Sequence, residues 1–200
     1  MSDLNVIIAA DVFGTSPEFK TLCQQISLAE AGSTAINYHV VGPYQTQPNS
    51  FSSEKSAYQY FIEHAGVEAY SEKLLSIIEA SSGLKLLIGF SVGGSAIWRL
   101  APKLASSGVI STICFYSSQI RHMTEIETTV PCQLVLPNSE EHFSVNELKA
   151  KMENKQQVNV EQCCYQHGFL NKLSNNYNQS GAKQYTRNIQ KFITKASLLL

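Results

Sequence analysis

The chain has 200 residues, 44% of them hydrophobic, which is enough to bury one substantial core, so we expect a single domain over residues 1–200. Its 15 basic and 16 acidic side chains give a formal net charge of −1 and form no basic block, which argues against a nucleic acid partner. No segment is long and apolar enough to span a bilayer, and the first ten residues lack the cationic start of a signal peptide. We therefore expect a cytoplasmic protein with no membrane partner.

Five cysteines are spread along the chain, and their number and spacing bear on redox state and metal binding. An odd count that includes two adjacent residues is poor geometry for a secreted disulfide framework, so reduced thiols are expected. No Cys-x-x-Cys pair is present to start a tetrahedral metal site. We expect neither a metal ion nor a cofactor. The cysteines are Cys23, Cys114, Cys132, Cys163 and Cys164.

Short apolar runs alternate along the chain with segments of helical periodicity. Nearly continuous apolar runs of this length are typical of parallel strands that are buried on both faces. The pattern predicts an α/β fold with a mostly parallel sheet of about six to seven strands and helices on both faces. The runs are residues 5–9, 35–41, 84–88, 109–115, 132–136 and 158–164.

The helices are predicted from their start and stop signals. Ser16 and Pro17 indicate the N-cap and first residue of a helix that closes at Ala31-Gly32. Residues 42–56 are rich in Pro, Gln, Asn and Ser and predict a long surface loop near the functional site. A helix over residues 54–79, broken near Gly66, follows the loop. Further helices are predicted over residues 94–104, 145–152 and 182–193.

The third predicted strand runs directly into the turn Gly89-Phe90-Ser91-Val92-Gly93, and a helix follows. A Gly-x-Ser-x-Gly turn needs this strand–turn–helix context, because only small residues at Gly89 and Gly93 let the strand and the helix pass each other. Ser91 is therefore predicted to be a nucleophile. The backbone N–H of Val92, at the start of the helix, is placed to stabilise an oxyanion on an acyl group that Ser91 attacks.

Candidate partners of Ser91 follow the later strands, since the functional groups of parallel sheets gather at the carboxyl ends of their strands. His167 follows the last predicted strand and is the expected general base. Glu140 and Glu141 follow the fifth strand, and the pattern alone leaves open which of them is the acid. His142 is the rival base, and His122, after the fourth strand, is a candidate for contact with the substrate.

Several segments resemble the dienelactone hydrolase family of α/β-hydrolases. The segment 6–14 is similar to the first core strand and following loop of that family, and 89–96 resembles its nucleophile turn. Phe115-Tyr116 resembles the aromatic pair that closes the next strand. Glu141-His142-Phe143 and His167-Gly168-Phe169 resemble the segments that carry the acid and the histidine. Because the resemblance covers most of the chain, it implies a single-domain α/β-hydrolase fold and hydrolase chemistry.

The resemblance also implies roles for individual residues. It selects Glu141 over Glu140 as the acid and makes the backbone N–H of Val12 the second oxyanion donor. Asp11 stands where the family has a glutamate that interacts with the resting nucleophile. Two departures are notable: Ser91 replaces the cysteine of the best-known members, and Asn171 replaces an arginine that holds a substrate carboxylate. Candidate residues of the substrate pocket are Asp11, Phe13, Phe90, Tyr116 and Asn171.

These observations lead to one principal functional hypothesis. We expect a monomeric or homodimeric serine hydrolase whose partner is a small-molecule ester-like substrate, namely a carboxylic ester, lactone or thioester. The alternative is a catalytically degenerate α/β-hydrolase fold that acts as a ligand-binding or interaction module, which Asn171 and the glutamate at position 141 favour. A transferase would use the same acyl-serine and differ only in whether an alcohol or amine outcompetes water.

Overall fold

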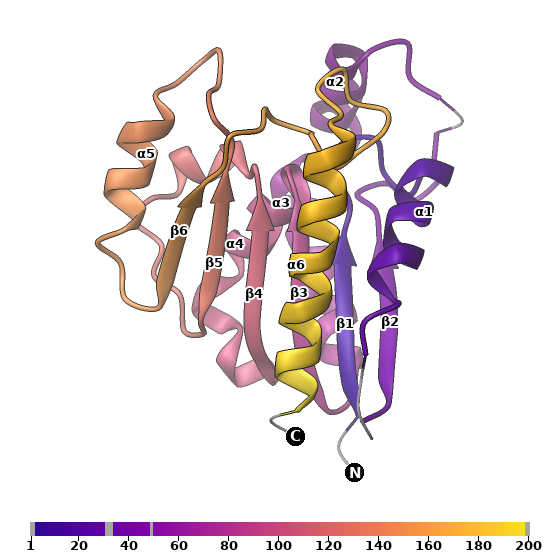
Figure 1. The fold of residues 1–200 in the computed structure, drawn as a ribbon, viewed down its shortest axis with the longest axis vertical. Coiled ribbons are helices and arrows are strands. Elements are labelled where there is room, and N and C mark those ends of the chain that lie inside the picture. Colours follow the sequence, from indigo (N-terminus) through magenta and orange to yellow (C-terminus); the bar gives the residue numbers. More distant parts are fainter. Residues whose placement is uncertain (1–2, 31–33, 49, 199–200) are drawn as a thin grey trace.

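The computed structural model describes residues 3–30, 34–48 and 50–198, and within them six strands form one parallel sheet. The spatial order of the strands is β2-β1-β3-β4-β5-β6, and all of them point toward the same edge of the sheet (Figure 1). The predicted parallel sheet is confirmed. The strands are β1 (Leu4–Ala9), β2 (Ile36–Val41), β3 (Leu84–Phe90), β4 (Val109–Phe115), β5 (Cys132–Leu136) and β6 (Val158–Gln162).

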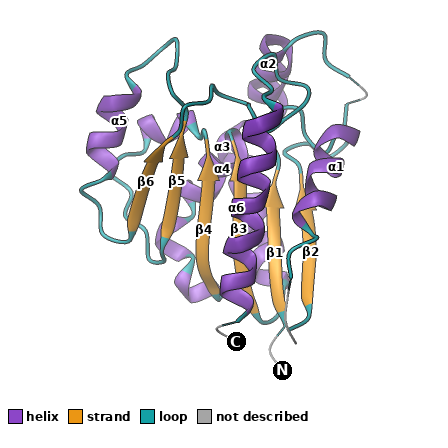
Figure 2. Cartoon of the chain, viewed as in Figure 1, coloured by secondary structure: helices purple, strands orange, loops and turns teal. Residues whose placement is uncertain are grey.

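Helices cover both faces of the sheet, as the sequence predicted (Figure 2). Helices α1 and α6 contact each other over one face, and α3 and α4 pack together over the other. Helix α2 lies beyond the carboxyl edge of the sheet, and α5 packs beside β6. The helices are α1 (Pro17–Ile26), α2 (Glu54–His64), α3 (Gly66–Ala80), α4 (Val92–Arg99), α5 (Val145–Met152) and α6 (Gln179–Ser197).

The apolar runs are continuous because each strand buries both of its faces. In β1, Ile7 and Ala9 belong to the core under α3 and α4, whereas Val6 and Ile8 belong to the core under α1 and α6. Successive side chains of a strand point to opposite faces, so two cores require an apolar residue at nearly every position. No helix in the described part of the chain combines the length and apolar character that crossing a bilayer requires.

The order of the strands places a topological switch point at the carboxyl edge. From β1 the chain passes through α1 to β2 at one edge of the sheet, and it then returns through α2 and α3 to β3 on the other side of β1. The connections after β1 and β3 therefore diverge, and such a switch point is where α/β sheets bind ligands. Ala9 and Gly89 are paired in register at this point, so the loops that follow both strands begin side by side.

Several predicted helix and strand ends differ from those in the structure. Helix α1 begins at Pro17 with the Ser16 hydroxyl as N-cap, as predicted, but it ends at Ile26. Its end is earlier because Leu28 and Ala29 bond three residues back, to Gln25 and Ile26, which tightens the chain into turns. The predicted end at Ala31-Gly32 lies outside the described residues.

The helix over residues 54–79 is broken near Gly66, as predicted, because Gly66 adopts a positive φ of 71° and interrupts the regular backbone between α2 and α3. Helix α4 begins at Val92 and ends at Arg99. Two short 3-10 turns follow, and the first, Ala101–Lys103, contains Pro102, which has no N–H group to continue the helix. Strand β6 ends at Gln162 rather than Cys164. Helix α6 is longer than predicted and is capped by the side chain of Asn178.

The closest contact between helix α4 and the sheet occurs where β3 turns into the helix. A Cβ atom at Gly93 would lie 2.5 Å from the carbonyl oxygens of both Ala9 and Ala10. A Cβ atom at Gly89 would overlap the backbone of Gly94. Both positions therefore require glycine for steric reasons, as the Gly-x-Ser-x-Gly pattern predicted.

We expect Gly93→Ala to lower the free energy of unfolding by about 3 kcal/mol, because the new methyl group overlaps backbone oxygens that cannot rotate away. Gly66→Ala is the matched comparison, since a Cβ atom there meets nothing within 4 Å and only the positive φ is unfavourable. That variant should lose about 1 kcal/mol. Urea denaturation of both variants measures the difference, and an equal loss would contradict the steric explanation.

Candidate active site

Ser91 lies between β3 and α4 in a conformation that few L-residues adopt, with φ at 51° and ψ at −114°. Its backbone is fixed from two sides: Ser91 N donates to Phe115 O at 2.9 Å, and the N–H and hydroxyl groups of Ser95 donate to Ser91 O at 3.0 and 3.1 Å. These bonds to β4 and α4 hold the strained turn. The turn carries the Ser91 side chain to the carboxyl edge of the sheet, where it is 7% exposed.

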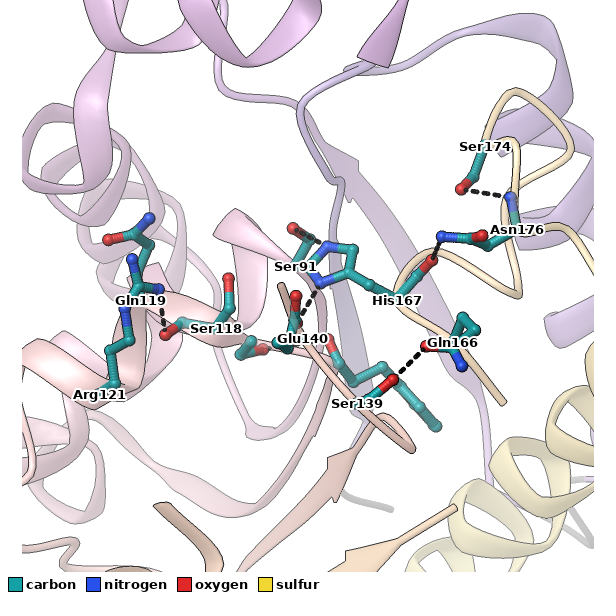
Figure 3. A network of polar contacts seen from close by, with 12 residues as sticks. Ser91, Ser118, Gln119, Arg121, Ser139, Glu140, Gln166, His167, Ser174 and Asn176 are labelled. Carbon is teal, nitrogen blue, oxygen red and sulfur yellow. Dashed lines mark hydrogen bonds and ion pairs between the residues drawn. The ribbon is translucent and has the colours of Figure 1, made fainter. Parts of the chain in front are cut away.

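Three side chains from three different loops are joined by two hydrogen bonds (Figure 3). Ser91 Oγ lies 2.9 Å from His167 Nε2, and His167 Nδ1 lies 2.7 Å from Glu140 Oε1. A carboxylate only accepts hydrogen bonds, so Nδ1 carries the proton and Nε2 accepts from the Ser91 hydroxyl. The loops after β3, β5 and β6 thus bring together a hydroxyl, an imidazole and a carboxylate.

Hydrogen bonds between the loops fix the position of His167. Asn138 N donates to Tyr165 O at 2.7 Å, and Ser139 Oγ donates to Gln166 Oε1 at 3.0 Å, so the loops that carry Glu140 and His167 are tied together. Asn176 Nδ2 donates to the carbonyl of His167 at 3.0 Å. The imidazole therefore has little freedom to leave its partners.

The carboxylate that contacts His167 belongs to Glu140 and not to Glu141, which the family resemblance selected as the acid. Glu140 is half-buried and points toward the imidazole, whereas the next residue, Glu141, is exposed to solvent. Neighbouring residues of an irregular loop point in different directions, and only the three-dimensional path of the loop determines which one reaches the histidine. His142 and His122 are also exposed, and within the described residues neither is hydrogen-bonded to Ser91.

The loop after β1 is held by side chains from the opposite side of the site. Three of them donate to its carbonyl groups, and the Asp11 carboxylate accepts from Phe13 N at 3.0 Å. Tyr44 and Gln47 come from the long loop predicted to lie near the site, whereas Tyr70 comes from α3 and no sequence pattern indicated its contact. The bonds are Tyr70 Oη to Ala10 O (3.1 Å), Tyr44 Oη to Val12 O (2.5 Å) and Gln47 Nε2 to Phe13 O (2.9 Å).

Two backbone N–H groups at the carboxyl edge of the sheet, one in the loop after β1 and one at the start of α4, have no acceptor within the described residues. Among the residues that the structure describes, neither Val12 N nor Val92 N donates to another protein group. Both residues are buried, and Val92 is the first residue of α4. A buried N–H group is nearly always paired, so these two donors are available for an acceptor on a ligand.

The predicted pocket residues lie in different environments. Phe90 is fully buried and packs on Phe19 and Phe115 under α1 and α6, so it is a core residue and not part of a pocket. Tyr116 is also buried, but its ring centre lies 5.1 Å from that of His167. Phe13 contacts the aromatic ring of Phe51, which is half-buried in the long loop.

Asp11 and Asn171 form a buried polar pair. Asn171 Nδ2 donates to Asp11 Oδ2 at 2.7 Å, and both residues are at most 3% exposed. Asp11 thus bonds to Asn171 and to Phe13 N rather than to Ser91, which differs from the contact that the family resemblance implied. The side-chain amide of Asn171 is bonded to Asp11 and is therefore not free to contact a substrate. No group of three His, Cys, Asp or Glu side chains in the described chain is arranged to hold a metal ion.

Comparisons with known proteins identify the fold. The sequence matches the model of the dienelactone hydrolase family over residues 2–197. No curated protein matches the chain in sequence. Solved structures with the same α/β-hydrolase architecture are similar over nearly the whole chain, and at their low sequence identities this similarity shows the fold alone.

Three of these structures illustrate the similarity. A dienelactone hydrolase-like promiscuous phosphotriesterase from metagenomic libraries has a TM-score of 0.68 and 13% identity, covering 98% of this chain and 87% of its own. The α/β hydrolase domain-containing protein 10 from mouse has a TM-score of 0.62 and 13% identity, with 96% and 90% covered. A monoacylglycerol lipase from Paleococcus ferrophilus has a TM-score of 0.61 and 10% identity, with 96% and 94% covered.

The buried carboxyl group of Asp11 has an altered proton affinity. Burial raises its pKa from 3.8 to about 6, although the hydrogen bonds from Asn171 and Phe13 and the charge of His167 act in the opposite direction. The nearby charge of Glu54 raises the pKa further. The folded protein therefore keeps this proton at pH values where the unfolded chain has lost it. This contribution to stability is complete below the unfolded pKa and is lost as the pH rises through about 6.

We expect Asp11→Asn to remove this pH dependence. Relative to the wild type, the free energy of unfolding of the variant should increase by about 3 kcal/mol or less as the pH rises from about 4 to about 7, because only the wild type loses stability over this range. Any loss of hydrogen bonding in the variant is independent of pH and cancels from the trend. Urea denaturation across this range measures it, with Asp3→Asn at an exposed carboxyl group as the control for removing one charge. A constant difference at all pH values would contradict the prediction.

Proposed function

Because the chain belongs to the dienelactone hydrolase family of α/β-hydrolases, we propose that it hydrolyses small carboxylic esters, lactones or thioesters through an acyl-serine intermediate. The observation that carries the proposal is the continuous hydrogen-bonded series from Ser91 Oγ through His167 to Glu140, at 2.9 and 2.7 Å. A serine hydroxyl is a weak nucleophile by itself, so it needs a base in direct contact and a group that orients that base. His167 and Glu140 fit these two roles.

In the first half of the reaction Ser91 Oγ attacks the carbonyl carbon of the substrate while His167 Nε2 takes its proton. Glu140 accepts the hydrogen bond from Nδ1 and stabilises the imidazolium that forms. The bond from carbon to the leaving group then breaks, and the imidazolium gives its proton to the departing oxygen or sulfur. In the second half, water replaces the serine as the nucleophile, the acid is released and the Ser91 hydroxyl is restored.

The two free N–H groups support a role in stabilising the transition state. Val92 directly follows Ser91, and Val12 lies in the loop after β1, whose start contacts Gly93; neither N–H group has a protein acceptor within the described residues. A tetrahedral intermediate carries a negative oxygen that such a pair can bind, and loss of one donor of this kind costs about 10²–10³-fold in kcat. Tyr44, which bonds to the carbonyl of Val12, fixes the peptide plane next to this donor before the substrate arrives.

Aromatic side chains beside the site favour a small apolar group on the substrate. The ring of Phe51 lies 6.4 Å from that of Phe13, 6.1 Å from that of Tyr44 and 5.5 Å from that of Tyr60, measured between ring centres. Phe51 and Tyr60 are only half-buried, so their free surfaces are available for contact with an acyl or leaving group.

We expect Ser91→Ala to lower kcat/KM for p-nitrophenyl butyrate by about 10⁴-fold or more, because the nucleophile is removed. A fluorophosphonate probe should label the wild-type protein at Ser91 and leave the variant unlabelled. Mass spectrometry of the labelled protein identifies the modified residue. A folded wild-type protein that neither reacts with the probe nor hydrolyses any ester of a short-chain panel would overturn the proposed function and favour a ligand-binding module.

The assignment of the acid can be tested on two adjacent residues. We expect Glu140→Gln to lower kcat by roughly 10²–10⁴-fold, because the amide no longer stabilises the imidazolium. Glu141→Gln is the matched control and should stay within about twofold of the wild type, since its side chain is exposed. Thermal unfolding of both variants checks that the fold is retained. The opposite ranking of the two variants would restore Glu141 as the acid.

A further inference from the structure

Glu54 places a carboxylate, in addition to that of Glu140, against the loop that follows His167, which we call the histidine loop. It is the first residue of α2, and its Oε2 accepts a hydrogen bond from Ser174 Oγ at 3.3 Å. A Cβ atom at Gly168, the residue after His167, would lie 3.5 Å from Glu54 Oε1. Figure 3 shows Ser174 and Asn176 in the loop that follows His167. Glu54 is half-buried, so it belongs to the wall of the site rather than to the open surface.

An acidic residue in the first turn stabilises a helix in any case, because it complements the helix dipole. The helix dipole explains why an acidic residue stands at the start of α2. It does not explain why the side chain of Glu54 contacts another loop. Glu54 is bonded to Ser174, 120 positions away in the sequence, and its charge reaches Asp11 and Tyr116 strongly enough to help raise the pKa of both. Its placement therefore has an electrostatic consequence for the site.

The carboxylates at the site have no lysine or arginine partner. Within residues 3–30, 34–48 and 50–198, the ion pairs are Arg99–Glu68, Lys149–Glu153, Lys155–Glu127 and His167–Glu140. Asp11 is bonded only to neutral donors, Asn171 and Phe13 N. Two charged groups shift the pKa of Asp11, namely His167 and Glu54, and of these only His167 can become positive.

Asp11, Glu54 and Glu140 thus surround the reacting serine and histidine with negative charge. This charge stabilises the imidazolium that forms during catalysis, but it repels any anionic group on the substrate. For two like charges about 8 Å apart at an effective dielectric constant of about 20, Coulomb's law gives a discrimination of roughly 30-fold. Within the described residues, no lysine or arginine is paired with these carboxylates to offset the repulsion.

We propose that the site selects esters with an uncharged acyl group and rejects those whose acyl chain carries a carboxylate, with Glu54 as the residue that sets this preference. The inference rests on the hydrolase function proposed above and adds the charge of the acyl group to it. Glu54 acts here on substrate charge, through space, and takes no part in proton transfer.

The experiment compares p-nitrophenyl valerate with the mono-p-nitrophenyl ester of glutaric acid, whose acyl chains have the same length and differ by one terminal carboxylate. The ratio of their kcat/KM values is corrected by the ratio of their alkaline hydrolysis rates. We expect the corrected ratio to favour the valerate ester by about 30-fold or more at low ionic strength and slightly alkaline pH. Glu54→Gln should lower that ratio at least about fivefold, mainly through better turnover of the glutarate ester.

Glu63→Gln is the matched control, because Glu63 lies on the same helix but is exposed and bonds only to Gln59 in the adjacent turn. It should leave the ratio unchanged. A corrected ratio near one, or a ratio that Glu54→Gln and Glu63→Gln leave equally unchanged, would overturn the charge preference while the hydrolase function stands. If the wild type hydrolyses neither ester, the proposed function fails and the charge preference fails with it.

Discussion

The backbone turn at Ser91 is the constraint on which the site depends. A residue held with φ at 51° and ψ at −114° is strained by about 1–3 kcal/mol, and this strain persists because neighbouring elements fix the turn. The bond from Ser91 N to Phe115 O ties it to β4, and the absence of side chains at Gly89 and Gly93 lets α4 lie directly against the end of β1. The same contact places the end of β1, from which the loop containing Val12 begins, against the start of α4, so one local geometry positions both the Ser91 hydroxyl and this loop.

The parallel sheet determines which segments can meet that turn. Because every described strand ends at the same edge, the loops after β1, β3, β5 and β6 converge although they are far apart in sequence. Ser91, Glu140 and His167 each come from a different loop. Direct bonds between loops, such as Asn138 N to Tyr165 O, convert this general convergence into hydrogen-bonding distances.

Burial of Asp11 connects the stability of the protein with the chemistry of the site. A carboxylate that is 3% exposed and bonded to neutral donors is unfavourable in the folded state, which is why its pKa rises to about 6. In return, the carboxylate fixes the backbone of the loop at Phe13 and adds negative charge near His167. Sites that need charge in fixed positions commonly give up stability for it. Glu54 adds to this charge from α2, at the opposite side of the histidine loop.

The sequence by itself determined the class of fold, the order of the strands along the chain and the nucleophile turn, because local patterns carry them. Continuous apolar runs reflect strands buried on both faces, and the glycines around Ser91 reflect a contact that no side chain can enter. The histidine that contacts Ser91 was also predictable, since His167 follows the last predicted strand. Only the tertiary structure decided which of Glu140 and Glu141 reaches the histidine. It also decided that Phe90 lies in the core and that Glu54 and Asn171 contact loops distant in sequence. Side-chain direction in an irregular loop and contacts across more than a hundred residues depend on the packing of the whole chain, which leaves no local periodicity to read.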